Sequence, residues 1–238
     1  MIAGNHDNHQ NVSAQIEYSR FNRRWNFPSL YHSSQWISDD KTVTVDLILI
    51  DTPGLSGTSP ITDKAHPNYY DKQPLRSKDE AQDQWTWIEE KLSTSTANYI
   101  IVGGHFSVYS VCDHGSDMTL LTYLKPLLEK YNANYMSGHD HCMEHLNVPG
   151  STVNYIVSGM GDDCCYKPSH TKDVPENSEK WSYSGKDLVK DIKDDSKREV
   201  VSGFTSFTAT STSLTFTFYD QAGRTLYTTP PIAPRQAN

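Results

Sequence analysis

Cysteine is scarce in this chain, which has four cysteines among 238 residues. They are Cys112, Cys142, Cys164 and Cys165, and none of them forms the C-x-x-C pair of a structural zinc site. Four cysteines are also too few for a scaffold held together mainly by disulfides. The sequence therefore leaves the redox compartment and the pairing open, although the adjacent Cys164 and Cys165 are poorly placed to pair with each other.

Long apolar runs and basic stripes are also missing. No apolar run reaches the roughly 18 residues that a membrane-spanning helix requires, and the chain does not open on a signal peptide. A formal net charge of −8, without a stripe of Lys and Arg, argues against a nucleic-acid or anionic-membrane surface. We therefore expect no membrane span, no nucleic-acid partner and a small or locally recognised substrate, and the oligomeric state stays open.

Three short polar clusters follow apolar runs of the kind that form buried strands. They are Gly4-Asn5-His6-Asp7, Val102-Gly103-Gly104-His105 and Gly138-His139-Asp140-His141. Ligands of α/β folds usually bind at the carboxyl edge of the sheet, so we expect the imidazoles and the amide to converge there. Imidazole nitrogens and amide or carboxylate oxygens suit Zn, Fe or Mn. The clusters therefore indicate a metal site.

Hydrophobic patterning predicts a single α/β domain over residues 1–238. Residues 1–4 resemble the end of a strand, and residues 52–78 and 168–197 predict surface loops, the second an exposed insertion. Helices are expected at residues 13–21, 79–92 and 117–131, and strands at residues 42–51, 99–102, 133–137, 152–157, 200–218 and 224–229.

Further stretches around the clusters carry a family resemblance. They are Arg24-Trp25-Asn26-Phe27-Pro28, Gly104-His105-Phe106-Ser107-Val108-Tyr109-Ser110 and Tyr155-Ile156-Val157-Ser158-Gly159. With the three clusters, they make the chain resemble, essentially end to end, a purple acid phosphatase of the small tartrate-resistant type within the calcineurin-like metallophosphoesterases. The resemblance implies a four-layer α/β/β/α sandwich with mixed sheets.

The resemblance also implies a binuclear metal centre, with Fe(III) beside a divalent Fe, Zn or Mn. Asn5, His105 and His139 would hold the divalent metal, and His141 would be a ligand of the ferric ion. Two metals lower the pKa of water and neutralise charge on the transferring phosphoryl group.

The implied activity is acid hydrolysis of phosphate monoesters by attack of a metal-bound hydroxide. His6 and His114 would contact the phosphate and help to protonate the leaving group. The substrate would be a small phosphate ester or a phosphoprotein.

The family also uses an upstream Asp, a metal-bridging Asp and a Tyr that binds the ferric ion, and the resemblance begins only at the third motif. We therefore expect an N-terminally truncated chain that lacks the first strands and part of the site. A catalytically inactive phosphatase-like binding domain is the alternative that this expectation raises.

Two other motifs give rival interpretations. His141-Cys142-Met143-Glu144-His145 fits the H-x-x-E-H pattern of a zinc metalloprotease, which requires one helix to present both histidines. Leu49-Ile50-Asp51-Thr52-Pro53-Gly54 imitates the metal-contacting loop of a GTPase, but the chain has no Walker A sequence. The GTPase interpretation therefore falls, while the metalloprotease remains an alternative that a helix would support.

The destination of the protein is suggested by one short sequence and by the resemblance. Asn11-Val12-Ser13 is a glycosylation sequon, which matters only in a secreted glycoprotein. Family resemblance implies a secreted, lysosomal or vacuolar protein.

Overall fold

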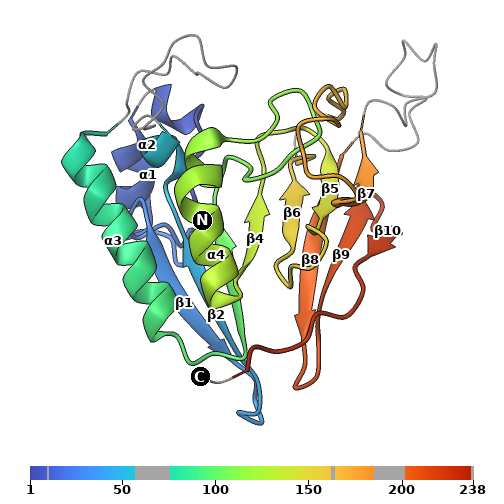
Figure 1. Ribbon diagram of the computed structural model, residues 1–238. Helices are drawn as coiled ribbons and strands as arrows, with labels where there is room; N and C mark the ends of the chain where they lie inside the picture. The colour runs from blue at the N-terminus through green and yellow to red at the C-terminus, as the bar shows by residue number, and fades with distance from the viewer. Residues whose placement is uncertain (10, 57–75, 162–163, 185–201, 237–238) are drawn as a thin grey trace.

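Two β-sheets form the centre of the protein (Figure 1). The structure, a computed structural model, describes residues 1–9, 11–56, 76–161, 164–184 and 202–236. The larger sheet has seven strands in the order β1-β2-β3-β4-β6-β5-β7, and the smaller has three in the order β10-β9-β8. The strands are β1 (His32–Ile37), β2 (Thr44–Leu49), β3 (Tyr99–Gly103), β4 (Asn134–Ser137), β5 (Met143–Leu146), β6 (Tyr155–Ser158), β7 (Glu179–Tyr183), β8 (Gly203–Ala209), β9 (Leu214–Asp220) and β10 (Thr225–Thr228).

The large sheet is mixed, as expected. Strands β2, β3, β4 and β6 run parallel to one another, whereas β1, β5 and β7 pair antiparallel with their neighbours. The carboxyl ends of the four parallel strands consequently lie along one edge of the sheet. This edge carries the loops that follow β3 and β4, which contain the second and third histidine clusters.

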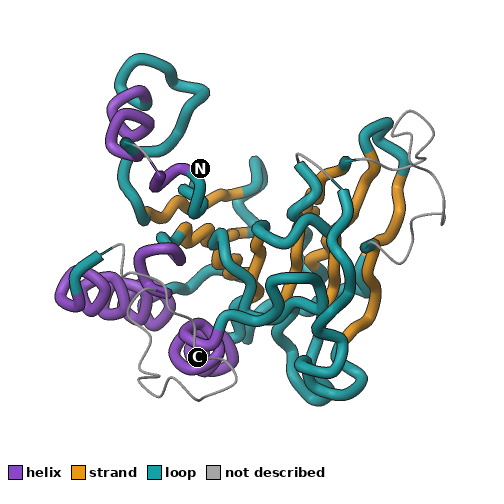
Figure 2. The backbone as a smooth tube through the Cα atoms, turned by 90° about the horizontal axis from the view of Figure 1, so that it is seen from above, coloured by secondary structure: helices purple, strands orange, loops and turns teal. Residues whose placement is uncertain are grey.

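The helices are α1 (Val12–Tyr18), α2 (Thr52–Ser56), α3 (Lys78–Thr94) and α4 (Lys125–Tyr131), with a 3-10 turn at Asp7–His9 and a π-helical turn at Leu120–Leu124. Helix α3 begins at a capping box, in which the Ser77 hydroxyl accepts from the Glu80 N–H and the Glu80 carboxylate accepts from the Ser77 N–H. Figures 1 and 2 show α3 and α4 on the same side of the large sheet.

The two faces of the large sheet belong to different cores, because successive side chains of a strand point to opposite faces. In β3, Ile100 and Val102 pack in the core that includes the buried faces of α3 and α4. Tyr99 and Ile101 pack instead with Leu214, Phe216 and Phe218 of the small sheet. The large sheet therefore lies between a helical layer and the second sheet.

Several boundaries differ from the sequence expectations. Residues 1–4 form no strand, and α1 begins at Val12, with Asn11 rather than Ser13 as its N-cap. Residues 52–56, expected in a surface loop, form the fully buried helix α2. Within the expected exposed insertion, Glu179–Tyr183 forms the edge strand β7. The rest of these two predicted loops falls partly at residues 57–75 and 185–197, outside the described residues.

Among the described residues, the structure contains no helix with the length and apolar character needed to span a bilayer.

Candidate metal centre

The loops after β3 and β4 are fastened to each other by backbone contacts. The Gly138 N–H donates to the carbonyl oxygen of His105 over 3.1 Å, and the Gly159 N–H donates to that of Cys142 over 3.0 Å. A Cβ atom at Gly159 would overlap the backbone of Asp140. Close approach therefore requires glycine at this position, and it holds the loop of His139 and His141 against the end of β6.

Asn5 and His105 form the closest contact among the predicted ligands. Oδ1 of Asn5 lies 2.7 Å from Nε2 of His105, and both side chains are half-buried. A Cβ at Gly4 would lie 2.8 Å from Cε1 of the His105 ring, so the N-terminal segment lies directly on that imidazole. The backbone of His105 is fixed separately, since its N–H donates to Oγ1 of the buried Thr52 over 3.0 Å.

Three of the predicted histidines form a continuous series of rings. The centroids of His105 and His139 are 4.9 Å apart in an edge-to-face arrangement, and those of His139 and His114 are 4.1 Å apart and stacked. His139 has a φ of +67°, an uncommon conformation for a residue other than glycine. Asn5, His105, His139 and His114 are thus brought together.

Asp140 anchors the loop of His114. Its Oδ1 accepts a 2.9 Å hydrogen bond from the backbone N–H of His114, and its side chain is fully buried. Burial raises the pKa of this carboxyl above its ordinary value, against the lowering effect of its hydrogen bonds. Sequence analysis gave Asp140 no role, although its place between His139 and His141 was the available signal.

The other two predicted residues lie beside different partners. The ring of His141 stacks on that of Tyr166, with ring centroids 4.4 Å apart, and the ring centroids of His6 and His9 are 5.0 Å apart.

Within the described part of the chain, the group of three His, Cys, Asp or Glu residues whose donor atoms lie within 4.8 Å of one another is Cys112, Cys142 and Glu144. Of the three predicted histidine ligands, His105 and His139 are therefore neighbours, and the three do not share one such cluster.

Cys112 and Cys142 form a disulfide, which joins the loop of His114 to the loop of His141. Glu144 lies beside it with no exposed surface, and its carboxylate accepts from the Ser110 hydroxyl at 2.9 Å and from the Val111 N–H at 3.1 Å. Burial raises the pKa of Glu144 to about 8. The sulfur atoms of the adjacent Cys164 and Cys165 lie next to each other, and the sequence left the pairing of these two residues open.

The H-x-x-E-H interpretation is wrong. Met143–Leu146 forms strand β5, so Glu144 and His145 point to opposite faces and no helix presents two histidines to one zinc ion. His145 is instead bonded to Oδ1 of Asn154 at 2.9 Å and to the Tyr227 hydroxyl at 3.0 Å.

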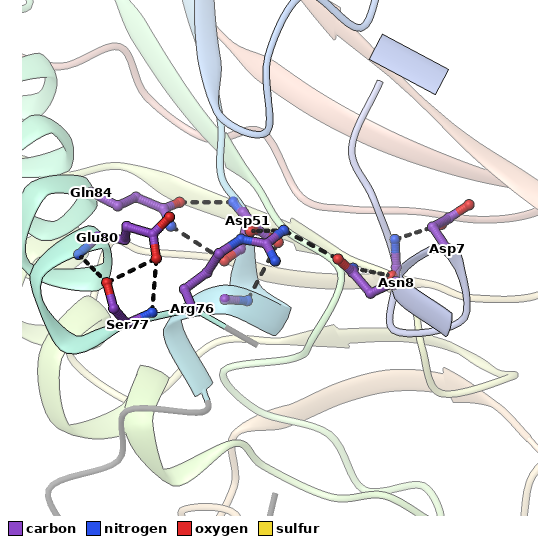
Figure 3. Close-up of polar contacts among 9 residues, drawn as sticks. Asp7, Asn8, Asp51, Arg76, Ser77, Glu80 and Gln84 are labelled. Carbon is purple, nitrogen blue, oxygen red and sulfur yellow. Dashed lines mark hydrogen bonds and ion pairs between the residues drawn. The ribbon is translucent and has the colours of Figure 1, made fainter. Parts of the chain in front are cut away.

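A second polar network contacts the segment that carries the cluster Gly4-Asn5-His6-Asp7 (Figure 3). Nη2 of Arg76 lies 3.2 Å from Oδ2 of the buried Asp51 and donates to Oδ1 of Asn8 over 3.1 Å. The amide of Asn8 in turn donates to the carbonyl oxygen of Gly4 over 2.9 Å. Gln84 of α3 accepts from the Asp51 N–H over 2.8 Å. The segment of Asn5 is thereby tied to the region of α2 and α3.

Comparison with known proteins shows which family has this fold and these loops. The model of the calcineurin-like phosphoesterase family matches residues 1–143. The chain belongs to this family. Tartrate-resistant acid phosphatase type 5 of Rattus norvegicus is 31% identical over 239 residues, covering 99% of this chain and 67% of its own length. The human protein of that name is 31% identical with 67% of its length covered, and purple acid phosphatase 4 of Arabidopsis thaliana is 27% identical with 60% covered.

The chain thus spans about two thirds of the length of these relatives. Among solved structures, GAP50, the anchor in the inner membrane complex of Plasmodium, aligns with a TM-score of 0.72 at 19% identity, over 99% of this chain and 65% of its own. That likeness shows the metallophosphoesterase fold. The family and its named relatives support a phosphatase of the purple acid phosphatase type.

The donor set at the sheet edge fits a divalent metal. The two atoms that face each other at 2.7 Å, Oδ1 of Asn5 and Nε2 of His105, are the donor types that Zn, Fe and Mn accept, with His139 as a neighbouring imidazole. His141 is the predicted ligand of the ferric ion, and its ring stacks on that of Tyr166. The fit is therefore good for one metal and incomplete for a second.

Proposed function

We propose that this protein is a metal-dependent acid phosphatase that hydrolyses phosphate monoesters. The observation that carries the proposal is the 2.7 Å contact between Asn5 and His105, continued by the rings of His139 and His114. Four side chains from three separate loops meet in this way at the carboxyl edge of the sheet, where folds of this kind bind their ligands.

In this proposal Asn5, His105 and His139 hold the divalent metal, and His141 contributes to a ferric site. When bound, such metals lower the pKa of water and neutralise charge on a phosphoryl group. In the metal-free protein, a proton between Nε2 of His105 and Oδ1 of Asn5 satisfies both atoms. Metal binding at Nε2 would require that proton to move to Nδ1, so the metal would select the other neutral tautomer of His105.

His114 and His6 are assigned to the phosphate and the leaving group. Both side chains are exposed, whereas those of the four proposed ligands are half-buried, as expected for groups that meet substrate from the solvent side. The hydrogen bond from the His114 N–H to Asp140 holds the backbone of His114 at the site, from which its imidazole would donate a proton to a departing alkoxide.

The proposed substrate is a small phosphate ester or a phosphoprotein. We further propose a secreted, lysosomal or vacuolar location with glycosylation at Asn11, supported by the Cys112–Cys142 disulfide, because disulfides persist mainly in oxidising compartments.

The test compares His139→Ala with His114→Ala. Metal content is measured by mass spectrometry after loading with iron and zinc, and turnover is measured with an aryl phosphate monoester. We expect His139→Ala to lose metal and activity together, and His114→Ala to keep metal while turnover falls about 100-fold or more. Normal turnover in His139→Ala contradicts the proposal. Folded wild-type protein without turnover would favour a phosphatase-like binding domain.

A further inference from the structure

Tyr166 contacts two residues of the candidate site and belongs to none of the three histidine clusters. Its ring is parallel to that of His141, with centroids 4.4 Å apart and 4° between the planes. The same ring meets His114 edge-to-face at 5.3 Å and 74°. One aromatic side chain therefore touches both a proposed metal ligand and a proposed proton donor.

The backbone holds Tyr166 in this position. Its N–H donates to the carbonyl oxygen of His141 over 3.0 Å, so the stacked residues are also joined through the main chain. Four residues further on, the N–H of His170 donates to the carbonyl oxygen of Val111 over 2.9 Å. We call residues 166–173 the clasp, because the segment bonds to the loop of His141 at one end and approaches the loop of His114 at the other.

The clasp packs closely on the loop of His114. The Ser169 hydroxyl donates to Oδ1 of Asp113 over 2.5 Å, and Nε2 of His170 lies 3.2 Å from the carbonyl oxygen of Asp113. Gly115 has a φ of +66°, and a Cβ there would lie 2.9 Å from Cγ of His170. The chain on both sides of His114 is consequently in contact with the segment that carries Tyr166.

We propose that Tyr166 is a positioning residue that fixes the ring orientations of His141 and His114; this inference rests on the proposed function of those histidines. An imidazole can rotate about its terminal torsion, which is broad and poorly restrained by itself. A parallel aromatic neighbour removes most of that freedom for His141, and the perpendicular contact restrains His114. The ring, not the hydroxyl, does this work.

The experiment compares Tyr166→Leu, which removes the ring, with Tyr166→Phe, which removes only the hydroxyl. Tyr123→Leu is the control, because Tyr123 is a part-exposed tyrosine that packs against Trp85 of α3. The first readout is the Hε1 resonances of His114 and His141 in metal-free protein, assigned from His114→Ala and His141→Ala. The second is the Fe(III) dissociation constant, measured by competition with a chromophoric chelator.

We expect Tyr166→Leu to move both histidine resonances as the ring current is lost, and to weaken Fe(III) binding about threefold to tenfold, the range of one aromatic pair, because His141 is the proposed ferric ligand. Tyr166→Phe and Tyr123→Leu should leave both readouts near wild type. Unmoved resonances in Tyr166→Leu, or equal losses in Tyr166→Phe, overturn the proposal. If wild-type protein binds metal without turnover, the proposed function fails while the resonances still decide the role of Tyr166.

Discussion

Asn5 and His105 are 100 positions apart in the chain, yet Oδ1 of one lies 2.7 Å from Nε2 of the other. This contact leads to the first prediction. Asn5→Leu removes the oxygen donor and keeps the approximate size of the side chain, so metal affinity should fall by more than the roughly tenfold to hundredfold that loss of a merely supporting contact costs. Asn5→Asp retains an oxygen and should keep most of the affinity. Zinc competition titration measures both.

Asn26→Leu, an exposed asparagine outside the candidate site, is the matched control and should bind zinc like wild type. Equal affinity in wild type and Asn5→Leu would remove Asn5 from the ligand set.

Arg76 should matter for stability because it lies beside a buried carboxylate. Asp51 is 1% exposed, and burial raises its pKa while the charge of Arg76 lowers it. Arg76→Leu would leave that carboxylate without its cation, at a cost of about 3–5 kcal/mol in the free energy of unfolding. Adding Asp51→Asn should restore part of the loss. Urea denaturation measures both variants.

The control for this prediction is Lys130→Leu. Lys130 pairs with Glu89 at 3.2 Å, but both side chains are more than half exposed, so the urea concentration at the midpoint of unfolding should hardly change. If Arg76→Leu also left the urea midpoint unchanged, the polar network in Figure 3 would not contribute measurably to the stability of the fold.

Glu144 should make the fold more stable in acid. Its pKa rises from an ordinary 4.5 to about 8, mainly through burial, with Asp140 and Glu179 acting in the same direction. The folded state therefore keeps a proton that the unfolded state has released, and this contribution is complete below about pH 4.5 and is lost as the pH rises through about 8. The slope is at most about 1.4 kcal/mol per pH unit.

Glu144→Gln should flatten this slope, because the amide stays neutral at every pH. The measurement is urea denaturation between pH 5 and pH 8 with the wild type alongside. A slope as steep in Glu144→Gln as in wild type would assign the effect to other groups.

The Cys112–Cys142 disulfide should contribute substantially to stability. It closes a loop with a sequence separation of 30, and constraint of the unfolded chain predicts about 3–4 kcal/mol. Cys112→Ala with Cys142→Ala should lower the unfolding free energy by that order. The Cys164–Cys165 pair has a separation of 1 and restrains almost none of the unfolded chain, so its double alanine variant should lose much less. Alkylation of Cys112 and Cys142 without reductant would contradict the prediction.

Much of the fold could be predicted because its elements have strong local patterns. The helix expected at residues 79–92 is α3, and the strand expected at residues 99–102 is β3. Helix α2 was missed because Pro53-Gly54 is typical of a turn, whereas burial against the rest of the protein stabilises the helix. Strand β7 was missed because its sequence is polar and charged, as an edge strand allows.

The candidate site could be predicted only as far as the loops that follow strands. Convergence of His105 and His139 followed from their places after β3 and β4. Tyr166 and Arg76 have no such signal, because their contacts depend on how distant segments pack. The roles of the proposed ligands stay predictions until metal binding is measured.

The segment of residues 1–8 belongs to neither sheet, yet it supplies Asn5 and His6. Its contacts with the rest of the protein include Asn5 with His105, Asn8 with Arg76, and the Met1 amine with the carbonyl oxygen of Asn26. Such a segment can detach locally while both cores remain folded, at a free energy far below that of global unfolding. A metal that requires Asn5 would bind only the attached form and shift this local equilibrium by mass action. The bound ion would therefore stabilise the attached form of residues 1–8. It would slow amide hydrogen exchange at Gly4 and Asn8 more than in either β-sheet.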